Sequence, residues 1–509
     1  MQGSSPSDRE LLDAKALVGH LVPAGSVHAF LADHRQALFP DTLFADLFAS
    51  ARGRPSVPAD VVATVMVLQS LEGLSDREAV TALVTDLRWK VAAGLALDDG
   101  GFHPTVLTLW RNKLRASKAP ERVFDAVRAV VAETGVLAGK NRRALDSTLL
   151  DDAVATQDTV TQLVSMIRRA RKAIPAAAAV TVTGHDYDQP GKPACAWDDP
   201  DARGQLVTAL VADARAILAA LDGVELSADQ AQLAGLLALV AGQDVEPGDT
   251  EGTWRVARRV APGRVISTVD PESRHAHKST AVYRDGYKAH IAVEPETGII
   301  TATDLTPANT PDGATGARLL AGEGPGLQVL GDSAYGPGPV RAQLTDAGHD
   351  VVIKPWPQAR NPRLGPDQFN RDDYQIDYQA RAVTCPSGHT VTISPKGTAN
   401  FGARCHRCPL RARCTAAATG KAFKVSDHDQ LLAAARKDWR NGTGLEDYQR
   451  HRPMVERTIA WLVANGHRRV RYRGVERNRL GLTTRAAAIN LRRLVNLGLT
   501  HTPTGWALA

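Results

Sequence analysis

The chain has 509 residues, which is too many for one compact core, so three or four structural units are expected. With 43% hydrophobic and 23% charged residues, the composition is that of an ordinary globular protein. The N-terminus has neither the basic start nor the apolar core of a signal peptide, and no segment approaches the ~20 uninterrupted apolar residues of a membrane-spanning helix. These features argue against a secreted or membrane protein and predict a cytoplasmic one.

Helical periodicity dominates the first part of the chain, and residues 1–135 are expected to form an all-helical N-terminal domain. Apolar residues recur at helical spacing between Pro55 and Leu114. Ser75 and Glu78 form a capping box that opens one of these helices. Three short helices with tight turns are typical of DNA-binding bundles and equally of helical scaffolds. A DNA-binding domain is therefore expected here, with a plain scaffold as the alternative.

From residue 136 onward the sequence contains short apolar strands and helices in alternation, which predicts a mixed α/β core. The expected strands cover residues 143–149, 288–293, 299–305, 327–331 and 350–354. The second and third of these strands are joined by a short turn containing proline and glycine, which is an antiparallel hairpin signal. A helical insertion at residues 151–264 interrupts the core, which is expected to comprise residues 136–150 and 265–357.

Four of the five cysteines lie within 30 residues of each other, in an expected loop-rich insertion at residues 358–430. They are Cys385, Cys405, Cys408 and Cys414. Their short spacings have the chelate pattern of a structural Zn²⁺ site, in which His389 or His406 can replace one thiolate. Free buried cysteines are the alternative. Cys195 stands alone and is interpreted as an isolated thiol.

Basic residues are concentrated near the C-terminus, where residues 431–509 are expected to form the last, helical part of the α/β domain and a basic tail. From Arg436 to Arg493 there are 15 Lys or Arg against 5 Asp or Glu, a local balance of +10. The net charge of the whole chain is +6, so the remaining residues sum to −4. Such a block indicates a surface for a polyanion such as DNA, with a solvated basic helical face as the alternative.

Two aspartates and one glutamate are placed to meet in one crevice. Asp146 and Asp332 stand at or near the C-terminal ends of two expected strands, and such ends in an α/β sheet face the same crevice. Glu456 lies at the edge of the apolar stripe on a helix expected to begin at Pro453. Carboxylates are the ligands that Mg²⁺ or Mn²⁺ prefers, and two such ions can activate the attacking oxygen and stabilise the leaving oxygen of a phosphoryl transfer. The trio therefore predicts a phosphoryl-transfer centre.

The sequence context separates this trio from other carboxylates, since an aspartate after a strand is more often a turn or cap residue, as we interpret Asp304 and Asp312. The context consists of Arg143-Ala144-Leu145-Asp146-Ser147-Thr148, Asp285-Gly286-Tyr287-Lys288-Ala289-His290, Leu330-Gly331-Asp332-Ser333-Ala334-Tyr335-Gly336 and Arg452-Pro453-Met454-Val455-Glu456-Arg457. Together these motifs resemble the DDE transposases of bacterial insertion sequences, specifically the family numbered eleven-eighty-two. The resemblance extends over nearly the whole chain beyond residue 50.

The resemblance implies an RNase H-like catalytic fold in which Asp146, Asp332 and Glu456 are metal ligands. It implies nicking of double-stranded DNA at the inverted repeats of the element's ends, followed by attack of the freed 3′ hydroxyl on target DNA. A dimer on DNA and a location at the bacterial nucleoid belong to the same expectation. The alternatives are a catalytically inactive DNA-binding derivative of a transposase and a metal-dependent nuclease without strand transfer.

Related transposases carry a tyrosine, an arginine, the glutamate and a lysine at set intervals. Arg452 keeps its interval before the glutamate, Tyr448 stands one residue too far upstream, and Val463 occupies the lysine position. Arg452 is expected to contact a DNA phosphate, and Lys288 is expected to do the same from the first hairpin, with a solvated strand edge as the alternative. The further expected DNA contacts are Arg468, Arg469, Arg471 and Arg473.

Overall fold

The computed structural model describes residues 1–5, 11–48, 50, 52–277, 283–442 and 444–509. Its N-terminal helices are α1 (Ala14–Val18), α2 (Val27–Leu38), α3 (Ala59–Glu72), α4 (Asp76–Thr85), α5 (Leu87–Ala93), α6 (Thr105–Ala116) and α7 (Arg122–Glu133). The predicted capping box of Ser75 and Glu78 is confirmed at the start of α4. α3 is buried on all sides over most of its length, so it forms the middle of this bundle. No helix in the described ranges is long and apolar enough to cross a membrane.

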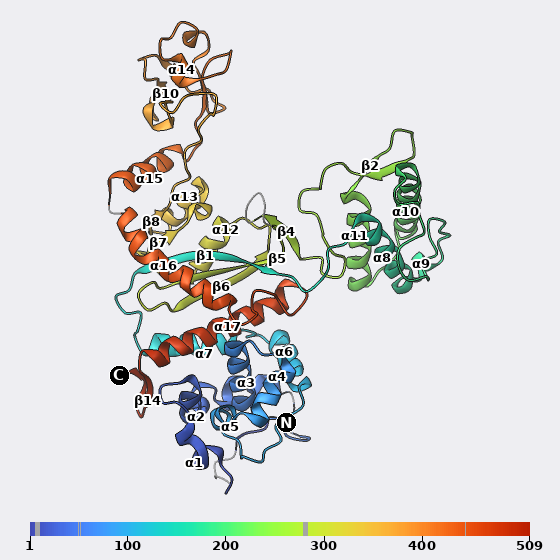
Figure 1. Cartoon of the computed structure of the whole chain (residues 1–509), viewed down its shortest axis with the longest axis vertical. Helices are drawn as coiled ribbons and strands as arrows, with labels where there is room; N and C mark the ends of the chain where they lie inside the picture. The colour runs from blue at the N-terminus through green and yellow to red at the C-terminus, as the bar shows by residue number, and fades with distance from the viewer. Residues whose placement is uncertain (6–10, 49, 51, 278–282, 443) are drawn as a thin grey trace.

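A mixed sheet forms the centre of the molecule (Figure 1). Its strands in the described ranges are β1 (Arg142–Asp151), β4 (Arg274–His277), β5 (Tyr283–Val293), β6 (Ile300–Pro307), β7 (Gln328–Gly331) and β8 (Asp350–Ile353). β1 pairs antiparallel with β5 and parallel with β7, and β7 pairs parallel with β8. β6 and β4 both pair antiparallel with β5, along different parts of its length. The predicted mixed α/β core and its hairpin are confirmed.

Helices cover both faces of this sheet, which is why its central strands are buried on both sides. One face packs against α16 (Gly444–Val463) and α17 (Val475–Asn496), and the other packs against α12 (Asp312–Leu319) and α13 (Gly338–Asp346). Along β1, Ala144 belongs to the core under α16 and α17, whereas Leu145 belongs to the core under α12 and α13. Because side chains alternate along a strand, the parity of a β1 residue decides which helices its side chain meets.

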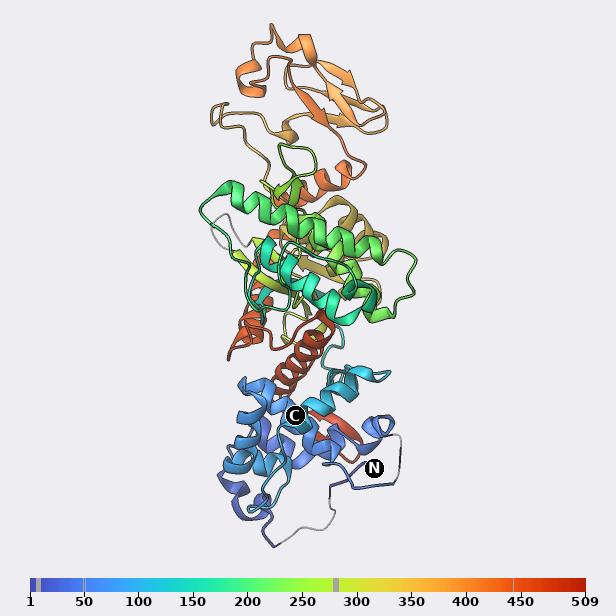
Figure 2. The same ribbon diagram turned by 90° about the vertical axis from the view of Figure 1, so that its right-hand side faces the viewer.

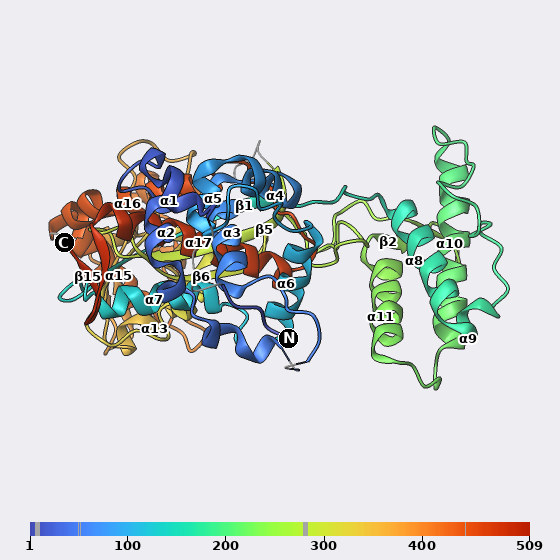
Figure 3. The same cartoon turned by 90° about the horizontal axis from the view of Figure 1, so that it is seen from below.

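The helical insertion between β1 and β4 has a hydrophobic core of its own. Its elements are α8 (Thr159–Ala173), α9 (Pro175–Ala178), α10 (Pro200–Ala220), α11 (Ala228–Gln243), β2 (Val245–Pro247) and β3 (Trp254–Val256). Figures 1 and 3 show this insertion standing away from the sheet on one side of the molecule. Because the insertion has its own core, the strands that precede and follow it in the sequence can still pair in one sheet.

A small lobe of short strands carries the clustered cysteines. Its elements are η4 (Arg371–Asp373), β9 (Gln375–Asp377), β10 (Ala382–Thr384), β11 (Thr390–Thr392), β12 (Thr398–Asn400), η5 (Gly402–Cys405), α14 (Arg411–Cys414) and β13 (Ala422–Lys424). Tyr374, Phe401 and Phe423 form the aromatic centre of its core. α15 (Asp429–Asn441) leads from the lobe back to α16. Figure 2 shows the lobe at one end of the molecule and the N-terminal helices at the other.

α17 joins the sheet to the N-terminal helices. It packs on β6 on one side and on α3 and α7 on the other, and Figure 1 shows it between these layers. The fully buried Asn490 donates from Nδ2 to the carbonyl of Ile300 and accepts at Oδ1 from the Ile300 amide, both at 2.8 Å. One side-chain amide thus satisfies both backbone groups of a β6 residue. The C-terminal hairpin of β14 (Leu499–Thr502) and β15 (Gly505–Leu508) then packs on α2 and α7.

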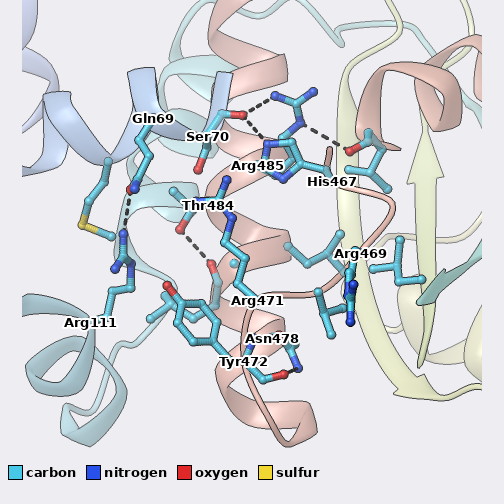
Figure 4. Close-up of a pocket in the computed structure, with 17 residues that line it drawn as sticks. Gln69, Ser70, Arg111, His467, Arg469, Arg471, Tyr472, Asn478, Thr484 and Arg485 are labelled. Carbon is cyan, nitrogen blue, oxygen red and sulfur yellow. Dashed lines mark hydrogen bonds between the residues drawn. The ribbon is translucent and has the colours of Figure 1, made fainter. Parts of the chain in front are cut away.

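Basic side chains from α17 and the loop before it cap the C-terminal end of α3 (Figure 4). His467 donates through Nε2 to the carbonyl of Ser70 at 2.8 Å, and Arg485 donates to Ser70 and to Leu71. Arg471 donates to the two carbonyls that directly follow the helix. The last carbonyls of a helix have no intrahelical partners and carry partial negative charge, so cationic donors stabilise them. This joint fixes the N-terminal bundle against the C-terminal segment.

Replacement of Asn490 by alanine is expected to lower the free energy of unfolding by about 2–4 kcal/mol, because two buried backbone groups of β6 lose their partner. Asn496→Ala, at the exposed end of the same helix, is the control and should change that free energy by less than ~0.5 kcal/mol. Urea denaturation followed by circular dichroism measures both variants. Equal midpoints for the two variants would contradict a specific role of Asn490.

The second prediction concerns His467, whose pKa is lowered to about 4 by burial and by the positive charges of Arg485 and Arg471. The unfolded chain, in which the histidine pKa is about 6.5, binds a proton that the folded chain excludes, so stability falls as the pH drops from about 6.5 to 4. His467→Gln keeps an N–H donor for Ser70 and is expected to remove about 1–2 kcal/mol of the stability difference between pH 7 and pH 5. Urea midpoints at both pH values test this, and an unchanged pH dependence in the variant would refute it.

Candidate active site

The register of the sheet places Asp146 and Asp332 side by side. β1 and β7 run parallel, and Ala144 pairs with Leu330 at the end of their ladder. Asp146 and Asp332 each follow two residues after this pair. Neighbouring strands lie about 4.8 Å apart, so the two aspartates stand next to each other. Both share the parity of Ala144 and Leu330, which belong to the core beneath α16 and α17, so both carboxylates emerge on that face. Asp146 lies within β1 rather than at its end, because the strand continues along β5 to Asp151.

Arg452 of α16 reaches across to the first of these carboxylates. Its Nη2 is 3.0 Å from Oδ1 of Asp146, and both side chains are largely buried. Burial raises the pKa of Asp146 above its ordinary value; the charge of Arg452 opposes this shift, and nearby Asp332 adds to it. Burial would lower the pKa of Arg452, but Asp146 and Tyr448 together outweigh that effect and raise it. Nε and Nη1 of Arg452 are buried and form no hydrogen bond within the described ranges, so this guanidinium is suited to take a phosphate.

Glu456 lies on the same stripe of α16. Tyr448, Arg452 and Glu456 follow one another at intervals of four residues, which places them along one side of the helix. Burial raises the pKa of Tyr448; the charge of neighbouring Arg452 opposes this, and the negative charges of Asp332 and Glu456 contribute to it. Tyr448 is therefore close to both carboxylates, while Glu456 itself is exposed. The third carboxylate and the two aspartates thus share one side of the sheet.

The structure extends α16 beyond what the sequence predicts, since the helix begins at Gly444 and contains Pro453 in its interior. Proline is favoured in the first turn of a helix, where its missing N–H costs nothing, and this preference is the reason for the later expected start. Val455 and Leu462 of the predicted apolar stripe are buried as expected. The additional turns bring Tyr448 to the site. In the sequence, the four-residue spacing between Tyr448 and Arg452 is the feature that indicates this position of Tyr448.

Most of the arginines that precede α17 bind oxygen atoms of the protein itself. Arg468 and Arg469 donate to three oxygens at and just beyond the end of β1, at 2.6–3.0 Å. Arg471 caps α3, as described above, and Figure 4 shows it with Arg469 around the joint. Arg473 is exposed. Contact between these four arginines and DNA stays a prediction.

Lys288 stands on the other face of the sheet from the aspartates. It pairs across β5 and β1 with Leu149, whose parity differs from that of Asp146, so its side chain meets α12. Its ammonium nitrogen is 3.0 Å from Oδ1 of Asp312 and donates to the carbonyl of Thr310 at 2.8 Å. A phosphate contact by Lys288 also stays a prediction.

The four clustered cysteines line one cavity of about 20 Å³ in the small lobe. Tight backbone turns follow Cys385 and Cys405, and all four side chains are free thiols. Burial raises the pKa of Cys414, and the neighbouring Cys408 and Cys385 contribute to that rise. Three chain segments that are separate in sequence therefore bring their thiols to the same place.

In the described part of the chain, no group of three or more His, Cys, Asp or Glu side chains is arranged to hold a metal ion. The donor chemistry nevertheless fits the expected ions. Two carboxylates at one level of neighbouring strands suit a hard cation such as Mg²⁺, and four thiols around one cavity suit Zn²⁺. Side chains in each place would have to move inward to complete the coordination of an ion.

Two family models match the chain. Residues 19–113, which include α2 to α5 and most of α6, match a model described as a transposase domain (DUF772). Residues 384–495, which include α15, α16 and nearly all of α17, match a model described as a transposase DDE domain. Neither match covers half of the chain, and both models describe transposase domains. Neither the curated proteins nor the solved structures contain a match to this chain.

The two matches support an insertion-sequence transposase, and the family implies that DNA is its partner. The DDE match contains Arg452 and Glu456, together with the four clustered cysteines, and begins after Asp146 and Asp332. Membership in the family numbered eleven-eighty-two stays a prediction.

Proposed function

We propose that this transposase nicks DNA at the ends of its element and joins the freed 3′ hydroxyl to target DNA, with Asp146, Asp332 and Glu456 as the metal-binding carboxylates. The observation that carries the proposal is the registered placement of the two aspartates beneath a helix that holds Arg452 and Glu456. The strand order β6-β5-β1-β7-β8, with β6, β5 and β1 antiparallel and β1, β7 and β8 parallel, supports the RNase H-like core that the sequence resemblance implies.

The chemistry assigned to this site needs oxygen ligands and a cationic contact for DNA. Two Mg²⁺ or Mn²⁺ ions, when bound, would supply activation of the attacking oxygen and stabilisation of the leaving oxygen. Asp146 and Asp332 would hold them from the sheet, and Glu456 would approach from α16. Arg452 would then offer to the scissile phosphate the N–H groups that find no partner in the described part of the chain, since a guanidinium binds phosphate oxygens in a fixed fork.

DNA contacts away from the carboxylates belong to the same proposal. Lys288, Arg468, Arg469, Arg471 and Arg473 are the candidate backbone contacts, and the N-terminal helices are the candidate for recognising the element's ends. Arg469, Arg471 and Arg473 are all exposed, and of these Arg469 and Arg471 are hydrogen-bonded within the protein. A dimer would bring the two ends of one element together.

The test incubates the full chain with Mg²⁺ and duplex DNA carrying the inverted repeats that flank its own coding sequence. Asp332→Asn is expected to lower the cleavage rate by more than about a hundredfold, because loss of even a neighbour of a metal ligand costs 10–100-fold. Asp350→Asn, at the start of the adjacent strand β8, is the matched control and should cleave like the wild type. Denaturing gels measure nicking and strand transfer.

The products decide among the alternatives. Nicking without joined products would indicate a nuclease, and binding of end DNA without nicking would indicate a catalytically inactive derivative. Equal cleavage by Asp332→Asn and the wild type would remove Asp332 from the site.

We further propose that the four clustered cysteines bind a structural Zn²⁺. Support comes from their common cavity and from the two tight turns that follow Cys385 and Cys405. Thiolates at such spacing grip one ion tetrahedrally, which stabilises a lobe too small for a large core. The ion would brace the lobe between the second and third carboxylates of the chain.

Zinc content is measured by metal analysis of the protein purified under reducing conditions. About one zinc ion per chain is expected, and the double variant Cys405→Ser/Cys408→Ser should lose it, because two thiolates are insufficient for a closed tetrahedral site. Cys195→Ser, in the helical insertion, is the control and should retain the ion. A wild-type chain free of zinc, with its four thiols reactive, would disprove this assignment.

A further inference from the structure

A polar cluster lies directly behind Asp146, on the opposite face of the sheet. Ser147 is the next residue of β1, and its side chain therefore points toward α12 rather than toward α16. Its hydroxyl donates to Oδ1 of Asp312 at 3.1 Å, and its backbone amide donates to Oδ1 of Asp146 at 2.8 Å. The residue between the two carboxylates is thus held by both, through its main chain on one side and its side chain on the other.

Asp312 joins two strands to the start of α12. The same oxygen that accepts from Ser147 is 3.0 Å from the ammonium of Lys288 and 3.7 Å from Nδ1 of His290. His290 is fully buried and pairs with Ser147 across the two strands. Lys288 donates in addition to the carbonyl of Thr310, in the loop that leads to α12. One carboxylate oxygen therefore organises side chains from β1 and β5.

Two glycines let α12 pack closely, Gly316 against Tyr335 and the sheet, and Gly313 against α13. A Cβ at Gly316 would lie 2.6 Å from Cδ1 of Tyr335 and 3.1 Å from Cδ1 of Leu145, and one at Gly313 would lie 2.8 Å from Cγ2 of Val340. Glycine inside a helix costs about 1 kcal/mol relative to alanine, so its presence twice in this short helix has a packing reason. The close approach also presses the helix against Tyr335, which follows Asp332 in the chain.

Helix capping does not account for Asp312. The cap position of α12 is Pro311, and no side chain of the described residues caps this helix. Asp304 is an instructive contrast, with a side chain 16% exposed against 15% for Asp312. Asp304 accepts from its own neighbour's amide and pairs with two arginine side chains, Arg318 and Arg479. Asp304 thus binds side chains of α12 and α17, whereas Asp312 binds the residue that adjoins Asp146.

We propose that Asp312 is a positioning residue of the catalytic centre. Its carboxylate holds Ser147, and through it the β1 backbone, so that Asp146 is presented at the level of Asp332 when a divalent cation binds. It also holds the ammonium of Lys288 at a defined place beside β1. The inference rests on the proposed function, because it assigns Asp312 to the same metal-binding carboxylates.

Mn²⁺ binding to the DNA-free full chain, followed by electron paramagnetic resonance, tests the proposal without any cleavage. Asp312→Asn keeps the size of the side chain but loses its charge, and it is expected to raise the Mn²⁺ concentration for half-saturation roughly tenfold, as neighbours of metal ligands do. Asp304→Asn is the matched control and should bind Mn²⁺ like the wild type. Ser147→Ala removes only one contact and should give a smaller rise, with no further rise when it is combined with Asp312→Asn.

The second measurement is the Mg²⁺ dependence of end cleavage, read together with the melting temperature. A positioning role predicts a raised Mg²⁺ requirement for Asp312→Asn at a melting temperature close to that of the wild type. A lowered melting temperature with an unchanged Mn²⁺ and Mg²⁺ requirement would show a structural role only and overturn the proposal. Mn²⁺ binding that Asp312→Asn weakens, in a wild type that cleaves no DNA, would instead overturn the proposed function and leave the positioning role intact. If the wild type binds no Mn²⁺, or if Asp332→Asn leaves its Mn²⁺ binding unchanged, both the positioning role and the proposed function are overturned.

Discussion

The paired hydrogen bonds between Asn490 and the backbone of Ile300 fix α17 on the edge of the sheet, and much of the remaining architecture depends on that attachment. α17 carries the N-terminal helices on its other side, and the loop before it caps the end of α3. α16, which precedes that loop, packs directly on β1 and its neighbours β5, β7 and β8, and also on α17. The position of Arg452 and Glu456 above the aspartates follows from this packing of α16 on the sheet.

The central sheet tolerates long insertions in the sequence because each insertion folds around a core of its own. The helical insertion has its own apolar core, and the cysteine lobe has an aromatic one. Neither segment takes part in the ladder that sets Asp146 opposite Asp332. That ladder needs only short stretches of β1 and β7, yet it decides the geometry of the two aspartates. The same stretch of β1 connects the site to α12 through Ser147 and Asp312.

Positive charge in the C-terminal segment has two uses that composition cannot separate. Arg468, Arg469 and Arg471 are hydrogen-bonded to oxygens of the protein, where they brace β1 and the end of α3. Arg473 is exposed to solvent, and Arg452 is buried with two nitrogens that have no hydrogen-bond partner among the described residues. An arginine that satisfies carbonyls stabilises the fold, whereas one with spare donors can bind a phosphate. The local excess of charge is the same in both cases.

The sequence by itself determined the mixed α/β core, the hairpin, the capping box before α4 and the strand that delivers Asp332, because these features depend on local periodicity and turn chemistry. It also indicated the transposase family through motifs that surround the three carboxylates. Tertiary structure alone decided the interior position of Pro453 in α16, the approach of Tyr448 to the aspartates and the contact of Asp312 with Ser147. Each of these depends on which strand pairs with which and how closely a helix approaches the sheet. Contacts between segments that are far apart in the sequence do not appear as a periodic pattern of residues.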